Sequence, residues 1–212
     1  MGCDINVVLM KDRTHSLTED TKAWSGDLIL SFKNYIKLPL SLIKSAHQAS
    51  VNFHPATPNY PGSGGLAWSL YHEDPYMGIT VHLMNEKIDN GKILKVYKKK
   101  VEYPTTLEKM TPILSQFHLK VFKKFLREFI FNGSDQLDLT CSDRNLGGWE
   151  WGKTVLKLSD LEKMKVLTSE IDKEEIKRRI RAFHLDKYPI KFLHEEHVSI
   201  LQSEKNVGVK AS

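Results

Sequence analysis

Apolar residues come in short runs along the first hundred positions, and polar or turn-forming residues separate the runs. Five of the runs have the length and composition typical of strands, at residues 5–10, 27–32, 49–53, 78–84 and 92–101. The second reads DLILSF, and such a continuous apolar run is typical of a strand buried on both faces. Between the runs, residues 39–45 and 65–71 predict short helices, the first of which begins with proline.

A long helix is predicted next, because apolar residues recur at helical spacing from Leu107 to Phe129. Thr105 and Glu108 have the spacing of a capping box. Pro112 lies inside the pattern, so either the first turn of the helix is kinked or the helix begins near Thr111. Residues 132–159 are polar and glycine-rich, which is typical of a connecting region with short strands.

The C-terminal part predicts one more helix and a hairpin. Asp172 and Glu175 form a second cap before the helical stretch KEEIKRRIRAFHL. After Tyr188-Pro189, the short apolar pieces at residues 190–193 and 198–201 predict a terminal β-hairpin.

Strands that alternate with helices predict an α/β fold with a parallel or mixed sheet, in which ligands lie beyond the carboxyl ends of strands. We expect a core at residues 1–131 and a C-terminal extension at residues 132–212 with connecting strands, a helix and the hairpin.

Composition indicates the cellular location and the classes of ligand to expect. The chain of 212 residues has no apolar run of transmembrane length, no secretory leader pattern and two cysteines, so we expect a cytoplasmic protein without a membrane partner. The net charge of +5 is mild. It would favour a phosphate-bearing or polyglutamate-bearing ligand, and no nucleic-acid partner is expected.

The first candidate functional residues lie in the stretch VNFHPATPNYPGSGG, residues 51–65. Asn52 and His54 are two apart on a predicted strand, so they share a face at its carboxyl end. This pair suits acyl transfer to an amine, in which the amide donates to an oxyanion and the imidazole handles a proton. A metal site is disfavoured because no second histidine lies at ligand spacing, and a structural histidine that bonds a carbonyl remains an alternative.

A second polar group follows in the turn Asp89-Asn90-Gly91 between two predicted strands. Taken alone, this is a hairpin turn. Beside a histidine at a strand end, the Asp89 carboxylate could hold the imidazole, orient a water and favour the imidazolium form.

Four segments together resemble the formyltransferases that use 10-formyltetrahydrofolate. They are Asn52-Phe53-His54, Tyr60-Pro61-Gly62, GITVH at residues 78–82, and Asp89-Asn90-Gly91, within a resemblance that covers residues 27–101. The resemblance implies a Rossmann-like core, 10-formyltetrahydrofolate as formyl donor, and a catalytic trio of Asn52, His54 and Asp89.

The resemblance also places the folate. The stretch SFKNYIKLP resembles the family segment whose backbone holds the pterin. The residues that it implies along the folate pocket are Phe32, Asn34, Tyr35, Ile36 and Leu38, with Asn90 and Gly91 on the other side.

Among these enzymes the sugar N-formyltransferases are the most similar, because DKEEIKRRIRAFHLDKYPIKFL resembles their C-terminal helix and hairpin. A nucleotide-linked amino sugar is therefore the expected acceptor, and a homodimer is suggested by the same analogy. The expected contacts to sugar or nucleotide are Tyr60, Gly64, His82, Trp149 and Trp151, with Arg144 and Lys153 as further candidates.

One departure keeps other functions open. Only 51 residues precede Asn52, so at least one strand-helix unit of the family core is expected to be shortened or missing. The alternatives are a folate-binding module, a formyltetrahydrofolate hydrolase without an amine acceptor, and an enzyme similar to methionyl-tRNA formyltransferase. No metal is expected, since the histidines of His-Glu-Glu-His at residues 194–197 are three apart instead of four.

Overall fold

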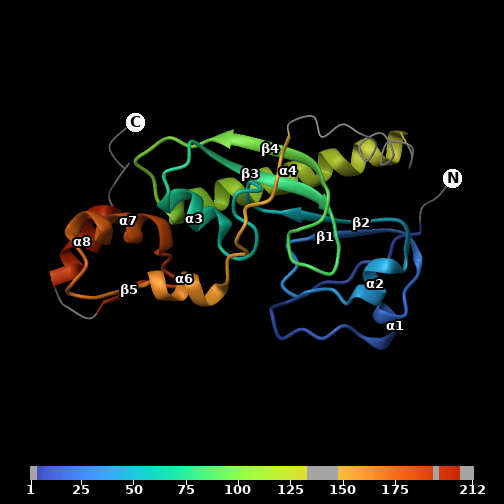
Figure 1. The fold of residues 1–212 in the computed structure, drawn as a ribbon, viewed down its shortest axis with the longest axis horizontal. Coiled ribbons are helices and arrows are strands. Elements are labelled where there is room, and N and C mark those ends of the chain that lie inside the picture. The colour runs from blue at the N-terminus through green and yellow to red at the C-terminus, as the bar shows by residue number, and fades with distance from the viewer. Residues whose placement is uncertain (1–3, 133–147, 193–195, 206–212) are drawn as a thin grey trace.

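The computed structural model describes residues 4–132, 148–192 and 196–205. A four-stranded sheet lies at its centre, in the order β1 (Gly26–Phe32), β2 (Ala46–His54), β3 (Tyr76–Leu83) and β4 (Ile93–Lys100) (Figure 1). β1 and β2 are parallel, whereas β3 is antiparallel to both β2 and β4. The predicted mixed α/β sheet is confirmed.

Helix α4 (Leu107–Asn132) packs on the sheet through aromatic rings. The ring of Phe53 on β2 lies 5.0 Å from that of Phe122 and 5.1 Å from that of Phe125. The predicted cap is displaced by one residue, because the Lys109 N–H donates to Oγ1 of Thr106 at 3.3 Å. The helix accommodates Pro112 in its second turn.

Two short helices, α1 (Glu19–Lys22) and α2 (Leu40–Lys44), accompany a second, smaller apolar cluster. Its buried members are Leu17, Leu38 and Leu42, and Ile29 of β1 packs against them. This cluster supports the loop between β1 and α2, which is the segment predicted to hold folate.

The C-terminal part contains α6 (Leu158–Met164), β5 (Val166–Leu167), α7 (Lys173–Phe183), β6 (Lys191–Phe192) and α8 (Glu196–Lys205). Helix α7 packs against α3 (Gly65–Tyr71), where the rings of Trp68 and Phe183 lie 5.1 Å apart. No helix among the described residues combines the length and apolar content needed to cross a membrane.

The predicted terminal hairpin is wrong. β6 pairs in parallel with β5, and residues 198–201 belong to helix α8. A four-residue apolar run has no distinguishing period, and tertiary contacts decide its conformation. Here the Arg181 guanidinium of α7 binds the buried carboxylate of Glu204 at 3.0 Å, which holds α8 as a helix against α7.

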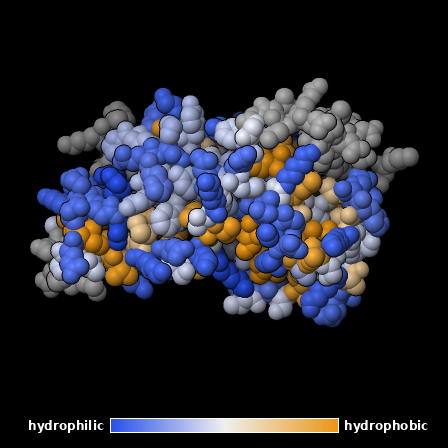
Figure 2. Space-filling model, viewed as in Figure 1, coloured by the Kyte–Doolittle hydropathy of each residue, from blue (hydrophilic) through white to orange (hydrophobic). Residues whose placement is uncertain are grey.

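The predicted strand at residues 5–10 is also wrong, because the segment pairs with no strand among the described residues. Ile5 and Leu9 are 75% and 80% exposed. An apolar run becomes a strand only where it finds a hydrogen-bonding edge. Apolar surface also shows over the region of β1 and α2 in Figure 2. Leu40, the first residue of α2, is 38% exposed.

Candidate active site

The carboxyl end of β2 brings Asn52 and His54 to one face of the sheet. Phe53 between them packs toward α4 on the other face. Asn52 lies opposite His82 in the antiparallel pairing of β2 with β3. The predicted common face of Asn52 and His54 is therefore present, and it includes His82.

Asp89 reaches the same place from the β3–β4 connection, with a φ of +43°. Its Oδ2 lies 3.1 Å from Nδ1 of His54 and accepts a 2.7 Å hydrogen bond from the Gly62 N–H. Its Oδ1 lies 3.3 Å from Nε2 of His82. The carboxylate thus lies between two histidines. A left-handed backbone at a residue other than glycine is strained, and such residues cluster at functional sites.

Backbone carbonyls fix the tautomers of both histidines. Nε2 of His54 lies 2.8 Å from the Tyr60 carbonyl oxygen, and Nδ1 of His82 lies 2.8 Å from the Leu83 carbonyl oxygen. A carbonyl only accepts, so each of these nitrogens carries a hydrogen and the other ring nitrogen faces Asp89. The atom of His54 that can gain a proton is therefore Nδ1, beside the carboxylate.

Burial and charge act on these groups in opposite directions. Burial lowers the pKa of His54 below its ordinary value, although the Asp89 charge opposes this effect. Burial alone would raise the pKa of Asp89. The neighbouring His82 and His54 and the Gly62 N–H instead bring the pKa of Asp89 below its ordinary value. Near neutral pH the pair thus holds a carboxylate beside a neutral imidazole.

Asn52 completes the group. Its Nδ2 lies 3.1 Å from Nε2 of His82 and 3.5 Å from Oδ1 of Asp89. The bond to His82 uses one of the two amide hydrogens, and the contact with Asp89 is long. The second hydrogen can therefore turn to an oxyanion in the site.

Five of the predicted folate residues lie along the segment that begins with the last residue of β1, with different local roles. Phe32 packs its ring on those of Phe122 and His118. Oδ1 of Asn34 accepts from the Ile36 N–H at 2.9 Å and shapes the loop. Tyr35 is half exposed, and Ile36 and Leu38 belong to the smaller apolar cluster.

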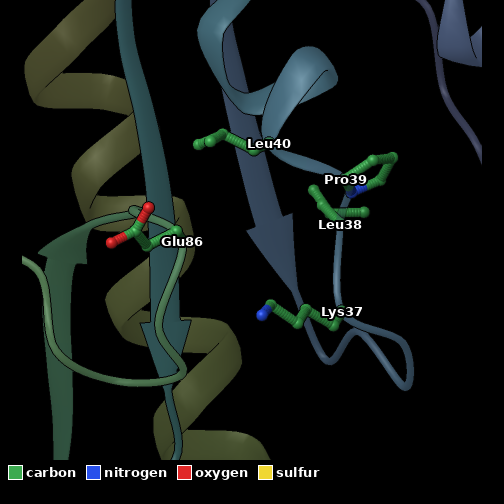
Figure 3. Close-up of a pocket in the computed structure, with 5 residues that line it drawn as sticks. All are labelled: Lys37, Leu38, Pro39, Leu40 and Glu86. Carbon is green, nitrogen blue, oxygen red and sulfur yellow. The ribbon is translucent and has the colours of Figure 1, made fainter.

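A pocket with a volume of about 320 Å³ opens beside this segment (Figure 3). The loop that leads into α2 contributes Lys37, Leu38, Pro39 and Leu40, and the β3–β4 connection contributes Glu86 across the gap. The same connection carries Asp89. Within this connection, Nδ2 of Asn85 donates to Oδ1 of Asn90 at 3.4 Å. A Cβ on Gly91 would lie 1.8 Å from the Leu83 carbonyl oxygen.

The residues predicted to contact the acceptor have different surroundings in the structure. Trp151 packs edge-on against the rings of His54 and His82, with centroids 5.8 and 4.9 Å away. Trp149 instead receives Lys98 of β4 over its ring at 4.0 Å. Gly64 is the N-cap of α3 and has a φ of +77°, and Lys153 is exposed.

Tyr60 enters the site through its backbone carbonyl. Its ring stacks on that of His72, and its pKa is raised by burial and by a hydrogen bond with Asp74. Arg144 and residues 194–195 lie outside the described residues, as do the side chains of residues 196–197.

Another polar cluster joins Glu108, His184 and Asp186, with ligand atoms within 4.8 Å of one another. Nδ1 of His184 accepts from the Ile190 N–H, so Nε2 of the neutral ring carries a hydrogen and points at Asp186. The Lys205 ammonium binds the same Asp186 oxygen at 2.5 Å. The cluster is satisfied as a hydrogen-bond network, which leaves a cation no free histidine lone pair.

Sequence reasoning missed the backbone part of the site. The Gly62 N–H and the Tyr60 carbonyl hold Asp89 and His54, and a backbone group has no signature in residue type. The surrounding cluster of proline and glycine was the available signal, because such a loop brings backbone groups close to side chains.

Comparison with known proteins finds a family match over the part of the chain that contains the candidate site. The family profile described as "Formyl transferase" matches residues 10–126. A methionyl-tRNA formyltransferase from Sulfurimonas denitrificans is 32% identical over 95 residues, which cover 42% of this chain and 31% of that protein. The chain spans less than half the length of the curated relatives it matches.

Solved structures share the fold over a longer part of the chain. A 4-N formyltransferase from Francisella tularensis is similar with a TM-score of 0.63 at 18% identity, covering 84% of this chain and 69% of that one. The formyltransferase PseJ from Anoxybacillus kamchatkensis has a TM-score of 0.52 at 23% identity, covering 68% and 71%. Its structure contains UDP-4,6-dideoxy-4-formamido-L-AltNAc and tetrahydrofolate.

Proposed function

The chain belongs to the formyl transferase family, and from this premise we propose that it transfers the formyl group of 10-formyltetrahydrofolate to the amine of a nucleotide-linked amino sugar. The observation that carries the proposal is the convergence of Asn52, His54 and Asp89. A carboxylate, an imidazole and an amide from two chain segments meet around one point, with 3.1 Å between His54 and Asp89.

The donor site that we propose shares the β3–β4 connection with this group of side chains, because Glu86 and Asp89 both lie on that connection. The loop between β1 and α2 and the β3–β4 connection border the pocket in Figure 3. Its lining combines Leu38, Pro39 and Leu40 with the charged ends of Lys37 and Glu86. Apolar side chains suit an aromatic donor such as a folate, and polar groups at the mouth suit its amide and carboxylate ends. The tetrahydrofolate in the similar PseJ structure supports this donor.

In the mechanism that we propose, the neutral amine attacks the formyl carbon and the carbonyl electron pair moves onto oxygen. The Asn52 amide donates to this oxyanion. The amine proton passes to the pair of Asp89 and His54, where Asp89 stabilises the imidazolium. The C–N10 bond then breaks with its electron pair on N10, and the pair returns the proton to N10. The products are a formamide and tetrahydrofolate.

The nucleotide-sugar acceptor has support outside the family match. The 4-N formyltransferase from Francisella tularensis shares the fold over 84% of this chain, whereas the matched family region ends at residue 126. The PseJ structure holds a nucleotide-linked formamido sugar. The C-terminal sequence around α7 resembles that of the sugar enzymes.

A second candidate acceptor is methionyl-tRNA, because several relatives are methionyl-tRNA formyltransferases. The family match at residues 10–126 contains the proposed catalytic trio, and a match to the family does not distinguish the acceptor.

The test is an acceptor screen. The protein is mixed with 10-formyltetrahydrofolate and, in separate reactions, with dTDP- or UDP-linked 4-amino sugars or with methionyl-tRNA, and tetrahydrofolate release is followed. Release that depends on one amino sugar supports the proposal. Release with methionyl-tRNA alone supports the second candidate. Release without acceptor indicates a hydrolase, and folate binding without release indicates a binding module.

A further inference from the structure

Residues 151–156, here called the strap, run along the loop that follows β2. The Gly152 N–H donates to the Pro58 carbonyl, the Leu156 N–H donates to the Pro61 carbonyl, and the Ser63 N–H donates to the Leu156 carbonyl, each at 2.8 Å. The strap lies beyond residue 126, where the family match ends.

Two glycines let the strap and the loop approach closely. A Cβ on Gly62 would lie 2.3 Å from the Leu156 carbonyl oxygen, and a Cβ on Gly152 would lie 2.5 Å from the Asn59 carbonyl oxygen. Because real Cβ atoms do not approach an oxygen so closely, both positions require glycine. The loop and the strap therefore fit each other as one unit.

The loop held by the strap is the one that holds the proposed catalytic side chains. The Tyr60 carbonyl accepts from His54 and the Gly62 N–H donates to Asp89. These two bonds fix the imidazole and the carboxylate relative to each other.

The Trp151 side chain makes a second connection, to the turn that carries Asp89. Its Nε1–H donates to the Gly91 carbonyl oxygen at 2.7 Å, and its ring makes T-shaped contacts with the rings of His54 and His82. Asp89 has a strained left-handed backbone, which persists only where surrounding contacts hold it. The Trp151 hydrogen bond is one such contact, two residues from Asp89.

From these contacts we infer that Trp151 is a positioning residue of the active site. It acts through the turn of Asp89 and the two imidazoles, and the strap delivers it there. The inference rests on the proposed function for its kinetic consequence only, since the geometry is a property of the protein alone. It differs from the expectation that Trp151 contacts the acceptor sugar.

The test is Trp151→Phe, which keeps an aromatic ring and removes the N–H. Misplacement of catalytic groups by a fraction of an ångström lowers kcat, and we expect a decrease of about 10- to 100-fold. The KM values for donor and acceptor should stay within about threefold of wild type if Trp151 only positions other groups. The imidazole resonances of His54 and His82 should also shift in ¹H–¹³C spectra recorded without substrate.

The matched control is Trp68→Phe. The Nε1–H of Trp68 on α3 is buried and has no hydrogen-bond partner among the described residues, so its removal should change neither kcat nor the two histidine spectra. If Trp151→Phe does not fold, Gly152→Ala replaces it. The added Cβ would press on the Asn59 carbonyl and move the strap with Trp151 unchanged.

The outcomes are distinct. Wild-type kcat and histidine spectra in Trp151→Phe would overturn the inference. A raised acceptor KM with unchanged kcat and unchanged spectra would also overturn it, in favour of direct contact with the sugar. If no acceptor supports turnover in the wild-type protein, the proposed function fails, and the spectra alone still decide whether Trp151 positions the histidines.

Discussion

Nδ1 of His54 lies 3.1 Å from Oδ2 of Asp89, and both side chains are more than nine-tenths buried. The other nitrogen of His54 donates to a backbone carbonyl, so the ring cannot rotate away without losing that bond. A proton that arrives at the pair is therefore held between one nitrogen and one oxygen.

Asp89→Asn should lower kcat by at least about a hundredfold, because the amide cannot stabilise the imidazolium of His54 by charge. The measurement is tetrahydrofolate release at saturating donor and acceptor, beside thermal unfolding of the same samples. Asp186→Asn is the control, since it removes an exposed carboxylate from the hydrogen-bond network of the C-terminal part. Activity of Asp89→Asn within threefold of wild type would contradict the role of the pair.

Asn52→Ala should lower kcat by about a hundredfold to a thousandfold, the usual effect of removing one oxyanion donor. Asn52→Asp should be at least as damaging, because a second carboxylate would lie near Asp89 and face the developing negative charge. Steady-state kinetics with separate KM values give the check. An alanine variant that changes only a KM would show that Asn52 binds a substrate and does not stabilise the oxyanion.

The pH dependence of kcat/KM tests the protonation state of the pair. Burial lowers the pKa of His54, and the base is active when neutral, so the fall in rate on the acid side should have its midpoint below pH 6.5. Asp89, whose pKa is also lowered, stays ionised over this range. A midpoint above pH 6.5 would mean that the imidazolium is the stable form in the free enzyme, against the balance of burial and charge inferred here.

Much of the fold around the site was predictable because its signals are local. The alternation of polar and apolar residues at Asn52, Phe53 and His54 predicts which face of the sheet each side chain occupies. The turn residues that begin with Asp89 predict that β3 and β4 form a hairpin. The signals failed at residues 5–10 and 198–201, where short apolar runs have no decisive period. Their conformations depend on a pairing edge in one case and on packing against α7 in the other.

The sequence predicted that the side chains of Asn52, His54 and Asp89 lie close together, and it did not predict the backbone groups that hold them. Asn52, His54 and Asp89 were candidates because of their residue types. Tyr60 and Gly62 instead act through backbone atoms, which residue type does not reveal. Trp151 was singled out by type, yet its partners come from other loops, and only the fold shows that it bonds the Gly91 carbonyl.

Gly91→Ala tests how tightly the turn of Asp89 is built. The new Cβ would lie 1.8 Å from the Leu83 carbonyl oxygen, and backbone cannot yield as a flexible side chain does. We expect a loss of about 1–3 kcal/mol in the free energy of unfolding, measured with urea. Gly148→Ala is the control, because nothing among the described residues lies within 4 Å of its Cβ position, although its φ of +59° carries a smaller cost. Equal losses in the two variants would contradict the close approach at Gly91.

His118 makes stability depend on pH on the face of β2 opposite Asn52 and His54. This histidine of α4 is 1% exposed, its ring lies 4.4 Å from that of Phe32, and one of its N–H groups bonds the Phe53 carbonyl between Asn52 and His54. Nε2 has no hydrogen-bond partner among the described residues. Burial lowers the pKa of His118 to about 4, so the folded protein opposes its protonation.

The sign of the effect follows from the two pKa values. In the unfolded chain His118 takes up a proton near pH 6.5, whereas in the fold it does so near pH 4. Stability from this group is complete above pH 6.5 and decreases as the pH falls toward 4, by about 3 kcal/mol at the lower end. His118→Gln retains a donor for the Phe53 carbonyl and does not titrate. Its urea unfolding free energy should therefore fall less between pH 7.5 and 4.5 than that of wild type, by about 2–3 kcal/mol. The carboxylates and His54 titrate alike in both proteins and cancel in this difference, so equal pH dependence would show that His118 is charged, or hydrated, in the fold.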